Sequence, residues 1–132
     1  MNTQEIRVGN FVNNGYKIEA IHRNAKLGSS KEADYFHSAY IKKKDNFNHV
    51  KISALKPEIL TKDWLLDFDF KCVNQISHLY LMKLKSVSIY VNLLNVGPQW
   101  KIEIRHKNNP YRIIEFVHQL QNYISDEMDF YL

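Results

Sequence analysis

The side chains of this chain that are best suited to catalysis or metal binding are six histidines and one cysteine. No two histidines have the HxH, HxxxH or HExxH spacing that places two imidazoles on one metal ion, so a zinc site would have to be assembled from distant strands. Cys72 is the only cysteine, which excludes an internal disulfide and a cysteine-based zinc centre, and we expect a buried, inert thiol. The histidines are His22, His37, His49, His78, His106 and His118.

Other catalytic patterns are also weak. Asp67 and Asp69 form a DxD pair, which binds Mg²⁺ in some enzymes, but the stretch LLDFDF alternates as the exit of a helix would, with both carboxylates solvated. The glycines are too widely separated to form a phosphate-binding loop, and no serine lies in a GxSxG elbow. We therefore predict no catalytic residue, no metal and no cofactor. An enzyme would require a pocket that gathers His, Asp and Cys72 from distant strands.

A lysine cluster offers a different chemistry. It follows an aromatic strand, and its mixture of cations and rings could bind single-stranded nucleic acid through charge and stacking. The alternative is a hairpin tip that uses lysine to protect an edge strand from aggregation. The candidate binding residues here are Lys42, Lys43, Lys44 and Lys51, with Tyr40, Phe47 and His49 nearby.

The net charge of +4 is concentrated in the first half of the chain. Residues 1–63 hold eleven Lys and Arg against seven Asp and Glu, whereas residues 64–132 hold seven against seven. A modest positive field attracts phosphate backbones or acidic protein patches. The charge therefore favours nucleic acid only weakly.

The first half has the pattern of a small, curled antiparallel sheet of about four strands. Apolar residues alternate on both sides of an Asn-Gly pair at Asn14 and Gly15, which predicts a hairpin with a type I′ turn. The stretches YFHSAYI and HVKIS predict two further strands. In the next stretch, LKPEILTKDWLLDFDF, the apolar residues change to helical spacing. Thr61 as N-cap and Asp63 in the first turn predict a short helix over about 62–67.

In the second half of the chain, the side chains alternate again with the two-residue period of a β-strand. Residues 79–84, 87–93 and 100–104 alternate, which predicts a three-stranded meander covered by one long terminal helix. Asn109 and Pro110 fit the cap and first position of that helix. Its core-facing stripe is expected to comprise Ile113, Phe116, Val117, Leu120 and Ile124.

The terminal helix would also carry a second row of mixed aromatic and polar side chains. This row either packs against the first half of the chain or forms a contact face for a partner, since Tyr, His, Gln and Asn suit interfaces. Its candidate residues are Tyr111, Ile114, His118, Gln121 and Asn122.

These patterns together predict a single α+β domain over residues 1–132, with a β-rich half at 1–60 and the helix, meander and terminal helix at 61–132. The short helix links the halves too briefly for a flexible linker, so we expect a shared core. The N-terminus lacks a signal-peptide pattern, and the longest apolar run, Leu79 to Met82, is far too short to cross a bilayer. We expect a cytoplasmic protein that does not contact a membrane.

Three stretches carry a resemblance to known proteins: EIRVGNFV near the start, LKPEILTKDWLLDFDF in the middle and EFVHQLQNYI near the end. They resemble signatures of small, mostly uncharacterised proteins encoded in phages and prophages of Bacteroidetes bacteria, over nearly the whole chain. The tail SDEMDFYL departs from the helix-extending ending of that family, which leaves a shared role of the C-terminus in doubt. The resemblance implies a phage-borne protein without an active site, located in the cytoplasm of the host bacterium.

Such proteins act by stoichiometric binding, and the resemblance implies an inhibitor of host defence, namely an anti-CRISPR protein against a type VI-B RNA-targeting nuclease. The expected partner is an RNA-guided nuclease, its guide RNA, or both, with the lysines steering toward bound RNA or an acidic groove. The alternative is a nucleic-acid-binding phage accessory protein with no host protein target. A phage structural component, which would self-associate, is a third interpretation.

Overall fold

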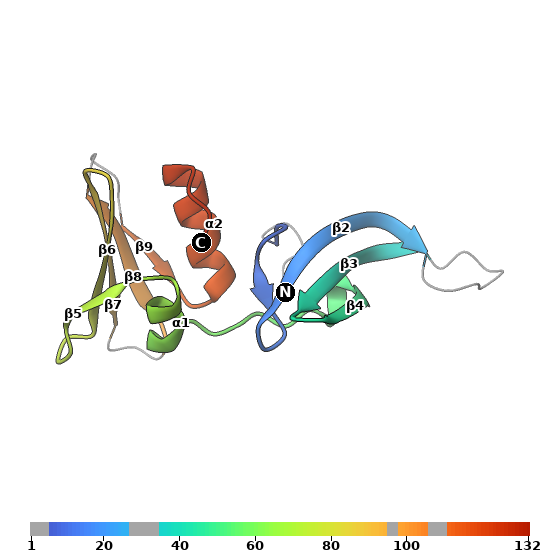
Figure 1. The fold of residues 1–132 in the computed structure, drawn as a ribbon, viewed down its shortest axis with the longest axis horizontal. Helices are drawn as coiled ribbons and strands as arrows, with labels where there is room; N and C mark the ends of the chain where they lie inside the picture. Colours follow the sequence, from blue (N-terminus) through green and yellow to red (C-terminus); the bar gives the residue numbers. More distant parts are fainter. Residues whose placement is uncertain (1–5, 27–34, 95–97, 106–110) are drawn as a thin grey trace.

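The computed structural model describes residues 6–26, 35–94, 98–105 and 111–132. They form an α+β fold with two antiparallel sheets, as the sequence predicted, although the second sheet has five strands and not three. The two sheets lie in separate lobes at opposite ends of an elongated molecule (Figure 1). We call the four-stranded sheet with its 3-10 turn the N-terminal lobe, and the five-stranded sheet with both helices the C-terminal lobe.

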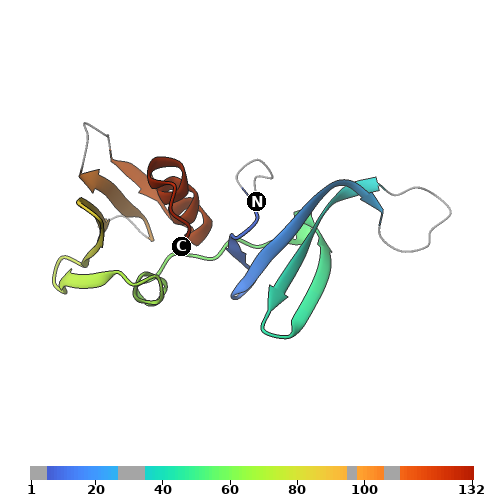
Figure 2. The same ribbon diagram turned by 45° about the horizontal axis from the view of Figure 1, so that its top comes forward.

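The N-terminal lobe is a curved sheet in which successive strands are neighbours. Its order is β1-β2-β3-β4, and β2 and β3 are long enough to bend across the lobe (Figures 1 and 2). The strand β2 has an irregular register at Ile18 to Ala20, where Glu19 is the extra residue of a bulge. The bounds are β1 Phe11–Val12, β2 Tyr16–Lys26, β3 Tyr35–Lys43, β4 Asn46–Lys51 and the 3-10 turn η1 Ile52–Ala54.

The first hairpin forms where the Asn-Gly pair predicted it, although its loop is longer than expected. Val12 pairs with Tyr16, so three residues make the turn, and all three have positive φ angles: Asn13 at 47°, Asn14 at 63° and Gly15 at 96°. Asparagine and glycine tolerate this left-handed region better than other residues. The strand before the turn is shorter than predicted, and Ile6 and Val8 lie outside it.

The C-terminal lobe contains the predicted meander and a strand on each side of it that the sequence did not indicate. The sheet order is β5-β6-β7-β8-β9. The turn expected at Gly97 and Pro98 lies partly outside the described residues. The strand bounds are β5 Lys71–Asn74, β6 Leu79–Leu84, β7 Val87–Leu93, β8 Trp100–Arg105 and β9 Arg112–Ile114.

The short helix α1, Lys62–Asp67, has the predicted bounds. The Thr61 hydroxyl accepts a hydrogen bond from the Trp64 amide at 3.5 Å, and Asp63 occupies the first turn. The segment before it, residues 55–61, is extended and connects the lobes (Figure 1). It is hydrogen-bonded to both lobes: the Asn13 amide donates to the Lys56 carbonyl at 3.0 Å, and the Val117 amide donates to the Glu58 carbonyl at 2.8 Å.

The terminal helix is shorter than predicted. Helix α2 spans Val117–Met128, with Phe116 at the N-cap, and residues 112–114 form the strand β9 instead of a first helical turn. The predicted start at Asn109 and Pro110 lies outside the described residues. The Gln119 side chain accepts from the amides of Glu115 and Phe116, which closes the start of the helix without a Ser, Thr or Asp cap.

Buried apolar side chains form two clusters, not the one shared core that the sequence predicted. One fills the N-terminal lobe and includes Ile18, Ile41 and Ile52. The other lies between the five-stranded sheet and the helices and includes Leu65, Ile102 and Leu120. Phe11 of β1 reaches across and packs on Trp64 and Phe68, with ring centroids 5.1 and 6.0 Å away. Hydrogen bonds from the side chains of Gln121 and Asn122 on α2 also join the lobes.

No helix in the described part of the chain has the length and apolar character needed to cross a membrane.

Candidate nucleic-acid interface

The outward side of the N-terminal sheet carries aromatic and basic side chains in three cross-strand rows. Residues directly opposite one another in an antiparallel sheet point to the same face. The buried partners Ile18, Ile41 and Ala39 point to the core, so the positions that alternate with them point outward. The rows are Lys17, Lys42 and Phe47; Ala20, Tyr40 and His49; and His22, Ser38 and Lys51.

We name this surface the aromatic–basic face and define it by Lys17, His22, Tyr40, Lys42, Phe47, His49 and Lys51. No Asp or Glu occupies any of the three described rows, and the nearest acidic residue along β2 is Glu19 in the bulge. The face therefore combines cations with rings on one open sheet surface.

The centre of the face is a group of three rings. Tyr40 and His49 stack nearly parallel, with centroids 4.2 Å apart and an interplanar angle of 11°. His22 meets Tyr40 edge-on at 5.3 Å. The imidazole Nε2 of His49 is hydrogen-bonded to the hydroxyl of Ser38 at 2.8 Å, and Ser38 is fully buried beneath it. These contacts fix the orientation of Tyr40, which remains 41% exposed.

A second aromatic position lies one row away. Phe47 is 62% exposed, and the ammonium of Lys42 lies 4.8 Å from the centroid of its ring. Single exposed apolar side chains are common on protein surfaces, so Phe47 is distinguished by its place beside Lys42 on this face and not by its exposure alone. Phe47 and the Tyr40–His49 pair are therefore two separate stacking positions on the same face.

The four lysines that the sequence analysis grouped together do not lie on a single surface. Lys42 and Lys51 belong to the aromatic–basic face by register. Lys43 alternates away from it, and its ammonium donates to the carbonyl of Asn14 at 2.7 Å and lies 6.0 Å from the ring of Tyr16. Lys44 is exposed in the tight turn, with φ of 53°. The hairpin-tip interpretation thus fits Lys44, and the nucleic-acid interpretation fits the other two.

The row predicted on the terminal helix does not exist as one surface. Tyr111 precedes the strand β9 and is exposed, whereas Ile114 is a buried residue of that strand. His118 and Gln121 are on α2, but they are 1% and 5% exposed. The prediction of a continuous outer row is wrong because the helix begins at residue 117 and not before residue 111.

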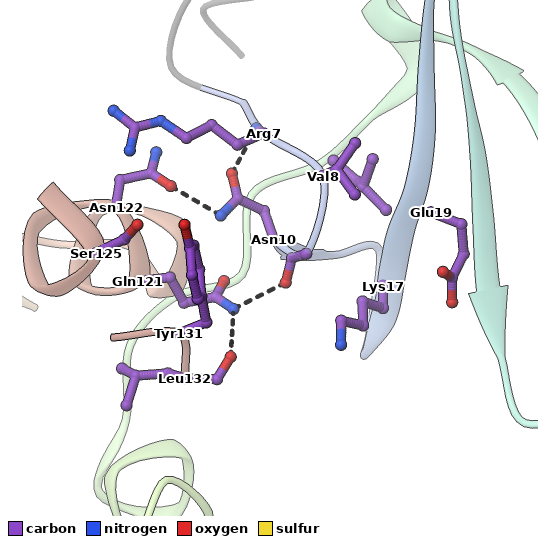
Figure 3. Close-up of a pocket in the computed structure, with 12 residues that line it drawn as sticks. Arg7, Val8, Asn10, Lys17, Glu19, Gln121, Asn122, Ser125, Tyr131 and Leu132 are labelled. Atoms are coloured by element: carbon purple, nitrogen blue, oxygen red, sulfur yellow. Dashed lines mark hydrogen bonds between the residues drawn. The ribbon is translucent and has the colours of Figure 1, made fainter. Parts of the chain in front are cut away.

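Part of this row instead packs on the first half of the chain, which was the alternative interpretation. Gln121 accepts from the Phe11 amide at 3.0 Å and donates to the Gly9 carbonyl at 2.9 Å. The side chain of Asn122 accepts from that of Asn10 at 2.9 Å. The helix α2 is thus a polar clamp between the lobes, as Figure 3 shows.

An ion pair completes this contact. The guanidinium of Arg7 binds both carboxylate oxygens of Asp126, at 2.6 and 2.9 Å. Hydrogen bonding to Arg7 lowers the pKa of the Asp126 carboxyl, and the same bond raises the pKa of Arg7. Both side chains are about half exposed, so the pair is worth less than a buried one.

A pocket of about 260 Å³ lies beside this clamp, between α2 and the start of β2. Lys17 and Glu19 lie on one side of it, and Asn122, Ser125 and Tyr131 lie on the other (Figure 3). Lys17 belongs both to this lining and to the aromatic–basic face, so the two features adjoin.

Among the described residues, a hollow on the C-terminal lobe gathers side chains of the kinds that an enzyme would need. This open hollow is lined by Asp63, Cys72, His78 and Tyr80. The thiol is exposed, so the expectation of a buried cysteine is wrong. Burial, followed by the adjacent Cys72 thiol, raises the pKa of the Tyr80 hydroxyl. Among the hydrogen bonds of the described residues, none joins His78 to Cys72 or Asp63, so a nucleophile, base and acid are not aligned there.

The described residues contain no group of three or more His, Cys, Asp or Glu side chains that could hold a metal ion.

No family model, curated protein or solved structure matches this chain. The resemblance to phage-encoded proteins therefore remains a prediction.

The sequence missed two members of the face. Lys17 and His22 are remote from the lysine cluster along the chain, and only the pairing of β2 with β3 brings them beside it. The alternation of Lys17 with Ile18 marked it as outward-facing, but the partner strand and register could not be read locally.

Proposed function

We propose that this chain is a non-catalytic binding protein that engages single-stranded nucleic acid, RNA above all, through its aromatic–basic face. The observation that carries the proposal is the stacked Tyr40–His49 pair, which lies on an open sheet surface between lysine-bearing rows. Aromatic rings on a sheet give bases a stacking surface, and lysines neutralise the phosphates of the same strand.

Single strands fit this surface better than duplexes. The π-face of a base is available to a protein ring only when the base is unpaired and unstacked from a neighbour. Rings packed on a sheet cannot enter the deep, narrow major groove of duplex RNA. A duplex would therefore reach only the lysines and bind through charge alone.

The setting comes from the resemblance of the three sequence stretches to phage proteins of Bacteroidetes. In that setting the single strand is the guide RNA of a bacterial RNA-guided nuclease, of type VI-B, and the protein is a stoichiometric inhibitor of host defence. The alternative, a phage accessory protein that binds nucleic acid without a host protein target, uses the same face. The two differ only in whether a protein accompanies the RNA.

Fluorescence anisotropy with a labelled single-stranded RNA and its matched duplex tests the face. We expect single-strand binding that weakens with salt, with a log–log slope of about −0.7 for each phosphate neutralised. Replacing Tyr40 with Ala should weaken single-strand binding by roughly 5- to 150-fold and leave duplex binding unchanged. Equal loss for both ligands would contradict stacking as the source of affinity.

Affinity capture from a host lysate, with and without RNase, separates the two settings. Recovery of an RNA-guided nuclease supports the inhibitor, and its persistence after RNase indicates a direct protein contact as well. Recovery of bulk RNA alone supports the accessory protein.

A further inference from the structure

The face has two stacking positions, and their separation specifies the form of the strand they accept. We infer that the aromatic–basic face holds two consecutive nucleotides of a stretched, pyrimidine-rich single strand, one base on Phe47 and the next at the Tyr40–His49 pair. The inference rests on the proposed function, because it presupposes that the face binds nucleic acid.

The spacing follows from the sheet itself. Phe47 and His49 are two residues apart on β4 and point to the same side, and each is opposite a residue of the same face on β3. A strand rises 3.2–3.4 Å per residue, so the two positions are roughly 7 Å apart. Bases that stack on one another along a nucleic acid strand are only about 3.4 Å apart. Two adjacent bases can therefore occupy both positions only if they have separated from one another.

Separating neighbouring bases has a cost that depends on the sequence. Purines stack on each other more strongly than pyrimidines do, and stacking strength together with backbone flexibility gives proteins that bind single strands modest preferences for pyrimidine runs. A strand of uridines is consequently easier to stretch over the two positions than a strand of adenosines. The selectivity requires no hydrogen bond to a base edge.

The side chains around the two positions allow a base to replace a contact within the protein. The ammonium of Lys42 lies 4.8 Å above the Phe47 ring, as an exposed cation–π contact that is weaker than stacking with a base. An incoming base therefore displaces it, and the freed ammonium stays within the row next to the phosphate that links the two nucleotides. Lys17, in the same row, adds a second cation on the β2 side.

The second position is already ordered. Tyr40 is held by the parallel ring of His49 at 4.2 Å and by a perpendicular ring contact with His22 at 5.3 Å, and His49 is hydrogen-bonded to the buried Ser38. Little side-chain freedom remains to be lost when a base arrives. Phe47, whose ring contact among the described residues is that with Lys42, is the weaker of the two positions.

A length series of oligouridines and oligoadenosines, from the mononucleotide to about ten nucleotides, tests the inference with full-length protein. We expect a steep gain in affinity from one to two nucleotides, a shallow gain thereafter, and tighter binding of uridine than adenosine at every length above one. Phe47→Ala should abolish the gain from the second nucleotide, roughly 5- to 150-fold, while mononucleotide binding is retained.

The matched control is Tyr111→Ala, which removes an exposed ring that lies beneath Lys101 at 4.5 Å on the other sheet and should leave the series unchanged. If the wild-type protein binds oligonucleotides but Phe47→Ala has no effect, or oligoadenosine binds more tightly, the two-position inference is overturned and the proposed function stands. If no oligonucleotide of any length binds at low salt, the proposed function itself fails.

Discussion

The outer faces of the two sheets contain similar residues but use them differently. On the five-stranded sheet, Glu103 lies between Lys101 and Arg105, 3.1 and 3.4 Å from their nitrogens. The guanidinium of Arg105 also lies 4.1 Å from the centre of the Tyr90 ring. Hydrogen bonding to Lys101 is the largest of the effects that lower the pKa of Glu103. On this face the Glu103 carboxylate is thus paired with two cations.

The N-terminal sheet has no such carboxylate within its rows. Its lysines lie beside rings that stack on one another, and the acidic Glu19 is confined to the bulge. Exposed aromatic residues and exposed cations contribute little to folding. This difference in arrangement supports our proposal that the outward face of the N-terminal sheet is a binding surface.

The largest effect is expected from breaking one of the two cores. Ile41→Ala should cost about 2–5 kcal/mol, because Ile41 is buried in the N-terminal cluster. Both tryptophans, Trp64 and Trp100, belong to or pack against the other cluster, so tryptophan fluorescence reports on the C-terminal lobe. Far-UV circular dichroism should show a transition at lower temperature than fluorescence does. Coincident transitions in the variant would mean that the lobes unfold as one unit despite their separate clusters.

The second largest effect on stability is expected from removing the Gln121 contacts between the lobes. Gln121→Ala leaves the Phe11 amide and the Gly9 carbonyl without their partner, which should cost about 1–3 kcal/mol in the free energy of unfolding. Urea denaturation measures the loss, and amide hydrogen exchange at Phe11 should accelerate. Gln75→Ala, at an exposed glutamine of the C-terminal lobe, is the control and should change stability by less than about 0.5 kcal/mol.

Charge reversal compares the two outer faces directly. Changing Lys17 and Lys42 together to Glu should weaken single-stranded RNA binding at least tenfold, about 1.4 kcal/mol, and reduce the salt slope by about 0.7 for each lost phosphate contact. The control changes Lys71 and Lys83, two exposed lysines of the five-stranded sheet, to Glu. It alters the net charge of the protein by the same amount. If this control weakens binding equally, total charge and not the aromatic–basic face accounts for affinity.

The smallest effect is expected at the Arg7–Asp126 pair. Asp126→Asn should cost below about 1 kcal/mol at neutral pH, because both side chains are about half exposed. The folded pKa of Asp126 lies below its unfolded value, so the stabilisation is complete above the unfolded pKa and is lost as the pH falls through the folded pKa. Melting temperatures of the wild type and variant should therefore differ at pH 7 and converge only when the pH falls below the folded pKa of Asp126, which lies under the ordinary value of about 3.9. A difference that persists there would assign the effect to packing.

Local signals predicted the local structure well. The helix α1 follows from the Thr61 cap and Asp63, and the first hairpin follows from Asn14 and Gly15, because each depends on neighbours in the sequence. The meander was evident from alternation alone. By contrast, residues 112–114 were assigned to a helix, since their apolar residues fit a helical stripe as well as an edge strand paired with β8.

The candidate site was only partly predictable for the same reason. Tyr40, Lys42, Phe47 and His49 lie on one hairpin, and the sequence could place them together. Lys17 and His22 join them through long-range pairing. The burial of Gln121 depends on the first half folding back onto α2, and the helical pattern of residues 117–128 carries no information about that contact.

The central claim is that the rings of the N-terminal sheet, and not exposed rings in general, bind an unpaired strand. The most direct test is the affinity of Tyr40→Ala and Tyr111→Ala for the same oligouridine under the same salt condition. We predict that Tyr40→Ala binds roughly 5- to 150-fold more weakly than the wild type and that Tyr111→Ala binds as the wild type does. Equal affinities for the two variants would contradict the claim.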